Sequence, residues 1–153
     1  TIKVWDATTG RLLHNLEGAD SFSYSLDGKM IASGSDDGTV KLWEVSTGRL
    51  LHNLEGHQGS VKSLSYNANG KMIASGSADT TVKVWEVSTG KLLHNLEGHQ
   101  GPVNTLSYSP DGKTIASGGE DTTVKVWEVS TGKLLHNLEG LPRVHSLSYS
   151  PDG

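Results

Sequence analysis

Two sets of side chains in this sequence contain the residue types of a serine hydrolase triad. Each set has a histidine, a serine 18 residues later and an aspartate 22 residues after the histidine: His57, Ser75, Asp79 and His99, Ser117, Asp121. Such a triad performs nucleophilic acyl transfer, with serine as nucleophile and histidine as base. The set occurs twice, however, and neither serine lies in the Gly-x-Ser-x-Gly turn of hydrolases. Repeated sets are better explained as structural networks of buried polar groups, so we predict no catalytic residue and no enzyme.

Four histidines form a second group with possible chemistry, as metal ligands. They stand at equivalent positions, one in each repeated segment: His14, His52, His94 and His136. Metal ligands must converge within a few ångströms, whereas one histidine per segment spreads the four apart. The acidic turns lack the alternating pattern of a calcium loop. Gly112-Lys113-Thr114 resembles the end of a phosphate-binding loop, but Ser107 stands where that loop needs a glycine. The sequence therefore predicts no metal and no cofactor.

These residues recur because the chain is built from repeats. The segment from Asp79 to Gly98 returns letter for letter from Asp121 to Gly140. The tryptophans are 38, 42 and 42 residues apart, at Trp5, Trp43, Trp85 and Trp127. A period near 40 marks a repeat architecture, in which each unit buries its faces on its neighbours. We divide the chain into a partial unit 1–18, full units 19–56, 57–98 and 99–140, and a partial unit 141–153.

Each full unit is predicted to form four short β-strands. In the unit 99–140 the apolar residues alternate along the first strand, and β-branched residues are frequent in the third. Proline, glycine and aspartate between these segments favour tight turns. The expected strands of this unit are 103–108, 114–117, 123–129 and 134–138. No segment has helical periodicity over three turns, so the predicted fold class is all-β.

The two ends of the chain hold incomplete units. The chain begins with the third and fourth strands of a unit, at 2–6 and 12–16, and ends after one first strand, at 144–149. This inventory gives fifteen strands, with no second strand for the divided unit. The joints at Gly18 and Gly140 are also shorter than those at Gly56 and Gly98. We expect either a longer native chain, of which this is a piece, or a homodimer to supply what is missing.

Composition restricts the partners. The 153 residues carry a formal net charge of -4 and no cysteine. The lack of cysteine excludes a disulfide scaffold and fits a reducing compartment, so we expect a cytoplasmic location. Lysine and arginine are spread through the repeats without a basic patch, so nucleic acid is not an expected partner. No apolar run approaches the roughly 20 residues that span a bilayer, so no membrane partner is expected.

Short motifs inside the repeats resemble the WD-repeat family of β-propellers, whose signature is Gly-His followed by Trp-Asp. The matching pairs are Gly56-His57, Gly98-His99, Trp85-Glu86 and Trp127-Glu128. The resemblance covers essentially the whole chain. It has two departures. The second dipeptide is Trp-Asp only at Trp5-Asp6, and Gly-His is replaced at Gly18-Ala19 and Gly140-Leu141.

The resemblance implies a β-propeller of four-stranded antiparallel blades, of which this chain forms a partial ring. It implies that the first strand of each blade lines a channel, and that the last strand of one unit closes the sheet of its neighbour. It also implies a structural hydrogen-bond network in each blade. By position, the complete networks are His57, Ser75, Asp79, Trp85 and His99, Ser117, Asp121, Trp127, while the set Ser33, Asp37, Trp43 lacks its histidine.

Function is expected at positions that differ between the otherwise near-identical units, because the common fold does not dictate them. They are Ser60, Pro102, Arg143, then Lys62, Asn104, His145, and Asp36, Ala78, Glu120. The family's geometry implies that all nine lie on one face around the channel mouth, which we call the top face. We predict a non-enzymatic scaffold that presents them to a protein or peptide partner. The alternative for these positions is neutral variation on solvated loops.

Two other functions stay open. The closest rival is a self-assembling structural repeat protein, in which copies of the chain form a closed propeller without a dedicated ligand. Closed propellers have about 4–8 blades, and a homodimer would approach eight. A glycan-binding or small-molecule-binding propeller would need an aromatic platform, and Phe22 is the one aromatic residue outside the repeated Trp and Tyr positions.

Overall fold

A computed structural model describes residues 1–153, and it is built entirely from strands, turns and loops, which confirms the all-β class. No helix in it is long and apolar enough to cross a membrane. The 14 strands are β1 (Ile2–Trp5), β2 (Leu12–Leu16), β3 (Ser21–Tyr24), β4 (Met30–Gly34), β5 (Val40–Glu44), β6 (Leu50–Leu54), β7 (Val61–Tyr66), β8 (Met72–Ser77), β9 (Val82–Glu86), β10 (Leu92–Leu96), β11 (Val103–Tyr108), β12 (Thr114–Gly119), β13 (Val124–Glu128) and β14 (Leu134–Leu138).

The strands form four antiparallel sheets, each from one continuous stretch of chain. β1 and β2 form a two-stranded sheet, and β3–β6, β7–β10 and β11–β14 form three four-stranded sheets in sequence order. Each full unit therefore supplies one whole sheet. The expected offset, in which the last strand of a unit closes the neighbouring sheet, is wrong for these unit boundaries. β6, β10 and β14 each pair with the strand just before them, because short turns keep consecutive antiparallel strands adjacent.

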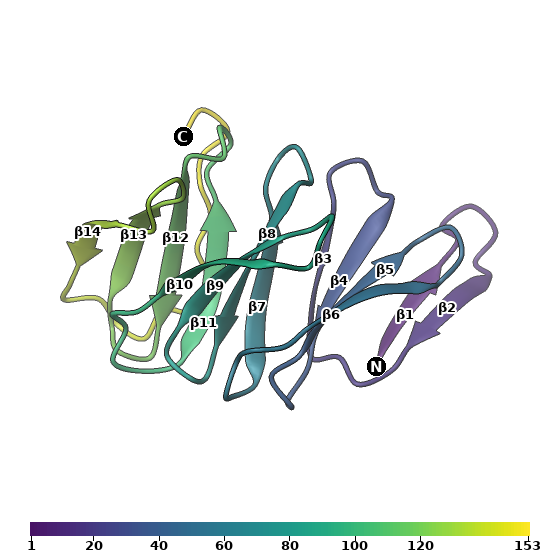
Figure 1. The fold of residues 1–153 in the computed structure, drawn as a ribbon, viewed down its shortest axis with the longest axis horizontal. Coiled ribbons are helices and arrows are strands. Elements are labelled where there is room, and N and C mark those ends of the chain that lie inside the picture. The colour runs from purple at the N-terminus through teal and green to yellow at the C-terminus, as the bar shows by residue number, and fades with distance from the viewer.

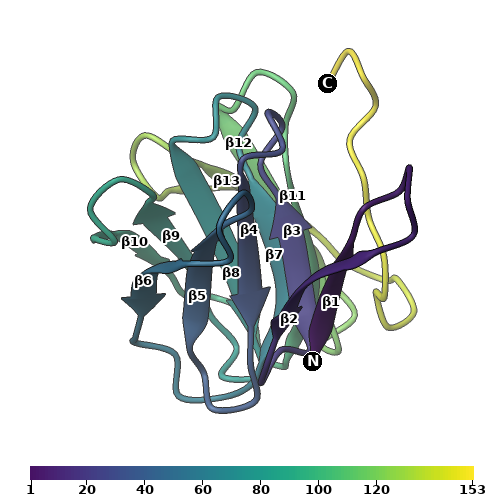
Figure 2. The same ribbon diagram turned by 90° about the vertical axis from the view of Figure 1, so that its right-hand side faces the viewer.

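The sheets follow one another in an open arc. Figure 1 shows β1–β2 at one end and β11–β14 at the other, with the ring not closed. Seen from the β1–β2 end, the four-stranded sheets stand one behind another (Figure 2). The first strands of neighbouring sheets lie beside each other, β3 next to β7 and β7 next to β11. This is the arrangement of propeller blades, in which the first strands form the inner side of the arc.

The hydrophobic core lies between the sheets. One cluster combines the inner residues of β8–β10, such as Val82 and Val84, with Val103, Ile115 and Trp127 of the next sheet. A second cluster joins the sheet β3–β6 to the sheet β7–β10 in the same way. The sheet β7–β10 contributes to both clusters, one on each side, so burial of apolar area ties it to both of its neighbours.

A glycine in the second strand lets neighbouring sheets approach closely. A Cβ atom built on Gly34 would lie 2.5 Å from Val61 Cγ1, and one on Gly76 would lie 2.8 Å from Val103 Cγ1. Any side chain there would push the sheets apart, because real Cβ contacts are longer. The repeated Ser-Gly of the second strand is thus a packing requirement.

Equivalent residues are buried inside the arc and exposed at its ends. The last leucine of the fourth strand is 2% exposed at Leu54 and 3% at Leu96, but 51% at Leu138. The tryptophan of the third strand is 2% exposed at Trp85 and 53% at Trp5. The residue types at these positions are the same, so the difference comes from the neighbours: Leu138 has no sheet over it, and Trp5 lies in a sheet of only two strands at the end of the arc.

The expected strand at 144–149 is wrong, and 14 strands form rather than fifteen. The segment nevertheless lies against the last sheet: the amide of Val144 donates to the carbonyl of Gly119 at 3.1 Å, and the Val144 side chain contacts Gly118. Tyr149 Oη and Thr114 Oγ1 are hydrogen-bonded at 2.8 Å. No second strand lies beside the segment, so no ladder of backbone hydrogen bonds forms.

The tyrosines that end the inner first strands differ from Tyr149. The hydroxyls of Tyr66 and Tyr108 are buried without a hydrogen-bond partner. In the sheet β7–β10 a methionine, Met72, stands where the last sheet has Thr114, and it packs against the cluster that contains Tyr108. Burial raises the pKa of Tyr108 far above its usual value, which keeps the hydroxyl neutral.

We expect Tyr108→Phe to leave the free energy of unfolding unchanged or to raise it by up to about 1 kcal/mol, since it removes an unpaired buried hydroxyl. Urea denaturation measures the change. The matched control, Tyr149→Phe, removes a hydroxyl that is hydrogen-bonded to Thr114 and is expected to lower the free energy of unfolding. A loss of more than about 1 kcal/mol in Tyr108→Phe would contradict the prediction.

Candidate functional site

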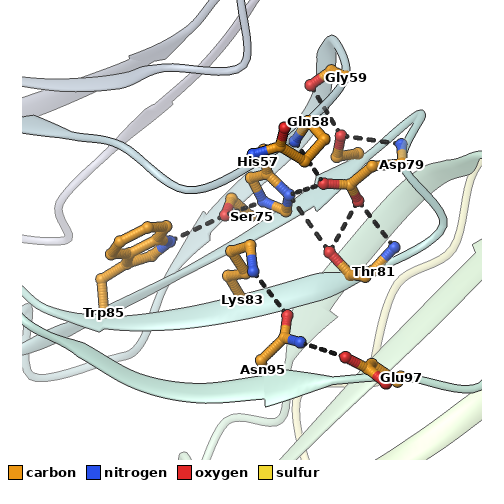
Figure 3. A network of polar contacts seen from close by, with 11 residues as sticks. His57, Gln58, Gly59, Ser75, Asp79, Thr81, Lys83, Trp85, Asn95 and Glu97 are labelled. Atoms are coloured by element: carbon orange, nitrogen blue, oxygen red, sulfur yellow. Dashed lines mark hydrogen bonds and ion pairs between the residues drawn. The ribbon is translucent and has the colours of Figure 1, made fainter.

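The polar residues of the middle unit form one connected network (Figure 3). His57 lies in the loop before β7, Ser75 in β8, Asp79 in the β8–β9 turn and Trp85 in β9. His57 Nδ1 is 2.8 Å from Asp79 Oδ2, and His57 Nε2 is 2.8 Å from Ser75 Oγ. The indole N–H of Trp85 donates to Ser75 Oγ at 2.9 Å. The network thus connects the loop that enters the sheet with its second and third strands.

Asp79 also holds the backbone of both loops. It accepts hydrogen bonds from the amide of Gln58 at 2.9 Å, from the amide of Thr81 at 2.9 Å and from Thr81 Oγ1 at 2.7 Å. The carboxylate therefore fixes the entry to β7 and the β8–β9 turn to each other. Rigid loops of this kind are what a binding surface requires.

The last full unit repeats the arrangement. His99 Nδ1 is 2.7 Å from Asp121 Oδ2, His99 Nε2 is 2.8 Å from Ser117 Oγ, and Trp127 Nε1 donates to Ser117 Oγ at 2.8 Å. Two networks with the same geometry in neighbouring sheets belong to the common fold of the repeat rather than to a single reaction centre.

The first full unit is arranged differently because its loop lacks a histidine. Trp43 Nε1 still donates to Ser33 Oγ, at 2.8 Å. Asp37 instead accepts from Ser35 Oγ, from the amide of Thr39 at 2.9 Å and from Thr39 Oγ1 at 2.7 Å. These bonds lower the pKa of Asp37 to about 2. Asp37 thus orders its own turn and makes no link to an entry loop.

The hydrogen bonds also determine the protonation pattern of the middle network. Ser75 Oγ accepts from the Trp85 indole, so its own hydrogen points to His57 Nε2. Neutral His57 then donates from Nδ1 to Asp79. This order of donors matches a hydrolase triad, but Ser75 is fully buried and already has an indole on its oxygen. A buried serine of this kind gives no access to a substrate carbonyl.

Burial sets the pKa values of the network. Burial lowers the pKa of His57 and of His99, and the hydrogen bond to the aspartate offsets this only in part. For Asp79, burial acts to raise the pKa, but hydrogen bonds from Thr81, Gln58 and His57 outweigh it and lower the pKa to about 2. At neutral pH the pair is a neutral histidine beside a charged aspartate.

Acid is therefore expected to destabilise the chain in two steps. A histidine whose pKa is lowered by folding binds fewer protons in the folded state, so stability is present above the unfolded value of 6.5 and is lost as the pH falls below it. The lowered pKa of Asp79 adds a second loss below its unfolded value of 3.8. Urea denaturation between about pH 7.5 and pH 3 measures both steps. A free energy of unfolding that stays constant or rises from about pH 7.5 to pH 5 would contradict the first step.

A second chain of polar contacts was not predicted from the sequence. Lys83 is buried and its ammonium donates to Asn95 Oδ1 at 2.7 Å, and Asn95 Nδ2 donates to Glu97 Oε1 at 2.6 Å. The same chain recurs at Lys125, Asn137 and Glu139. Lysine and asparagine face each other because β9 and β10 pair in this register. The recurrence of lysine in the third strand and of asparagine in the fourth is the sequence feature from which this pairing could have been predicted.

The variable residues of neighbouring units meet at the loop end of the sheets. Ser60 Oγ donates to Asp36 Oδ1 at 2.7 Å, across the boundary between two sheets. The amide of Ala78 donates to the carbonyl of Ser60 at 2.9 Å, and the amide of Glu120 donates to that of Pro102 at 3.0 Å. The entries to the first strands and the second-to-third turns therefore share one surface.

The remaining variable residues lie beside these. Lys62 in β7 is exposed and Asn104 in β11 is half-buried, while Arg143 and His145 are exposed in the carboxyl-terminal segment, which is not a strand. The structure shows no hydrogen bond that joins these four side chains to one another.

The four repeated histidines do not gather. His14 Nε2 is 2.8 Å from the carbonyl of Val45, and His52 Nε2 is 3.2 Å from that of Ser88, each in the following sheet. No group of three or more histidine, cysteine or carboxylate side chains is placed to hold a metal ion. His14 and His52 instead connect the outer edges of successive sheets.

Comparison with protein families gives one match. The model of the family described as WD domain, G-beta repeat, matches residues 10–44, 48–86 and 90–128. Each matched interval runs from the fourth strand of one sheet to the third strand of the next, for example from β6 to β9. The repeat as the family model delimits it is therefore offset from the sheet by one strand, whereas the units 19–56, 57–98 and 99–140 each coincide with a sheet. No curated protein sequence matches the chain.

Proposed function

Because the chain belongs to the WD40-repeat family, we propose that it is a non-enzymatic scaffold whose top face binds a protein or peptide partner. WD40 repeats generally mediate protein–protein interaction or scaffolding, and WD40 proteins are typically not enzymes. The top face consists of the entries to the first strands and the second-to-third turns. Its rigid loops would present side chains that differ from sheet to sheet.

One observation carries the proposal. The hydrogen bond between Ser60 and Asp36 joins variable residues of two neighbouring units on a single surface. The buried networks beneath it are repeated, whereas the residues above them are not. A fold that keeps its frame constant and varies one surface suits recognition by many small contacts. The serines of the networks are buried, so they do not support a hydrolase function as an alternative.

The self-assembling structural repeat remains a second candidate, favoured by the end faces. Trp5 and Leu138 are exposed at opposite ends of the arc, although their equivalents are buried. We propose that further blades cover these faces, either from a longer chain or from a second copy in a homodimer. Mass measurement in solution separates a dimer from a monomer.

We expect the combined variant Lys62→Ala, Asn104→Ala, Glu120→Ala to lose at least about tenfold in the amount of partner captured from a cell extract, because contact residues of an interface act together. The measurement is quantitative mass spectrometry of proteins retained by the immobilised chain. Circular dichroism checks that the variant keeps its β-structure.

The control variant changes exposed residues at the opposite end of the sheets, Lys71→Ala, Ser88→Ala and Lys91→Ala. Its captured proteins should equal those of the wild-type chain. The top-face proposal fails if the Lys62, Asn104, Glu120 variant captures the same proteins in the same amounts.

A further inference from the structure

Two threonines on the top face have a backbone conformation that threonine avoids. Thr80 has φ 74° and Thr122 has φ 63°, and they are the only residues other than glycine with positive φ. They occupy the same place in the β8–β9 and β12–β13 turns. In this left-handed region the Cβ atom crowds the backbone, and a β-branched side chain makes the crowding worse.

The turn itself needs this conformation, but it does not need threonine. In the first full unit the equivalent residue is Gly38, with φ 83°, and glycine adopts this conformation without strain. The chain thus has an unstrained glycine at this position in one unit and a strained threonine in the next two. Folding of the turn therefore does not by itself account for the threonine.

The hydroxyls of the two strained threonines make no hydrogen bond inside the chain that could offset the strain. Thr81 and Thr123, the next residues, donate from Oγ1 to Asp79 and Asp121 at 2.7 and 2.9 Å. The hydroxyls of Thr80 and Thr122 take part in no hydrogen bond in the structure. Thr122 is exposed and Thr80 is half-exposed. Both side chains are therefore at least partly open to a molecule outside the chain.

We infer that Thr80 and Thr122 are contact residues for the polypeptide partner of the top face. The inference rests on the proposed function. To the variable residues of the top face it adds two residues that are the same in neighbouring units. Strained backbone conformations concentrate at sites where the side chain has to be held in place for a function. Each threonine follows an aspartate that is anchored to the entry loop, so its position is fixed before a partner arrives. An extended peptide that crosses both turns would meet the same hydroxyl and methyl pair twice.

The test uses a displayed library of random linear peptides selected on the wild-type 153-residue chain. Selected peptides are then measured against the double variant Thr80→Gly, Thr122→Gly and against the control Ser88→Ala, Ser130→Ala at the opposite end of the sheets. We expect the glycine variant to bind at least about tenfold more weakly and the control to bind as the wild type does. We expect only a small change in the melting temperature of the glycine variant, since removal of strain raises it and the greater flexibility of the unfolded chain lowers it.

The outcomes separate the two proposals. If no peptide is enriched, or if enriched peptides bind the Lys62, Asn104, Glu120 variant unchanged, the proposed function of the top face fails. If peptides depend on those residues but bind the glycine variant with wild-type affinity, the function stands and the inference about the threonines is overturned.

Discussion

Replacing Trp85 with alanine is expected to lower the free energy of unfolding by about 3–5 kcal/mol, the cost of emptying a fully packed aromatic site. The side chain is 2% exposed and belongs to the core between the sheets β3–β6 and β7–β10. Its indole also donates to Ser75 Oγ, which would be left with an unsatisfied acceptor. Small domains have about 5–15 kcal/mol in total, so a large fraction of the stability is at risk.

The repeat provides a matched control. Trp5 is the same residue in the same strand position, but 53% of its surface is exposed. Trp5→Ala should therefore cost less than about 1 kcal/mol, as most surface substitutions do. Urea denaturation of both variants followed by far-ultraviolet circular dichroism measures the two costs. Equal losses would show that the sheets do not bury one another as described.

The second large effect is expected for Asp79→Ala, which should lower the free energy of unfolding by about 3 kcal/mol. The substitution removes the acceptor of His57, of the Gln58 amide and of both Thr81 donors. His57 is buried, so its Nδ1–H would lose its partner without access to water. The entry loop and the β8–β9 turn would also lose their common anchor, which should broaden amide signals of both loops in nuclear magnetic resonance spectra.

Asp37→Ala is the comparison for this variant. Asp37 orders its own turn and has no histidine partner, so its loss should be clearly smaller and confined to that turn. Hydrogen exchange of the loop before β7 distinguishes the two variants, because only Asp79→Ala should speed exchange there. If both aspartates prove equally costly, the link through His57 contributes nothing and the network has been misread.

The sequence was sufficient for the fold class and for the course of most strands, since the apolar alternation and the turn residues recur in each unit. It also named the residues that the structure joins around His57 and His99. It was insufficient for the segment at 144–149, because a strand depends on a neighbour and not only on its own pattern. Sequence position likewise placed Asp37 in one network with Trp43. Without a histidine to connect them, Asp37 bonds only residues of its own turn.

Two further features needed coordinates. The bond between Lys83 and Asn95 depends on the register of β9 and β10, which no motif specifies. The positive φ of Thr80 could not be foreseen, because threonine ordinarily argues against that conformation. The backbone conformation of the turn determines which residue has a positive φ, and this conformation is known only from the structure.

Each full unit forms one complete sheet, and this affects how the coding sequence tolerates the insertion or deletion of repeats. Recombination between near-identical copies adds or removes whole multiples of the repeat, and here such an event would insert or delete a finished sheet with its own buried network. The neighbours would meet a surface like the one they had before, so the reading frame and the packing would survive together. Descendants of such a gene would differ in how many sheets they encode while each sheet kept its structure.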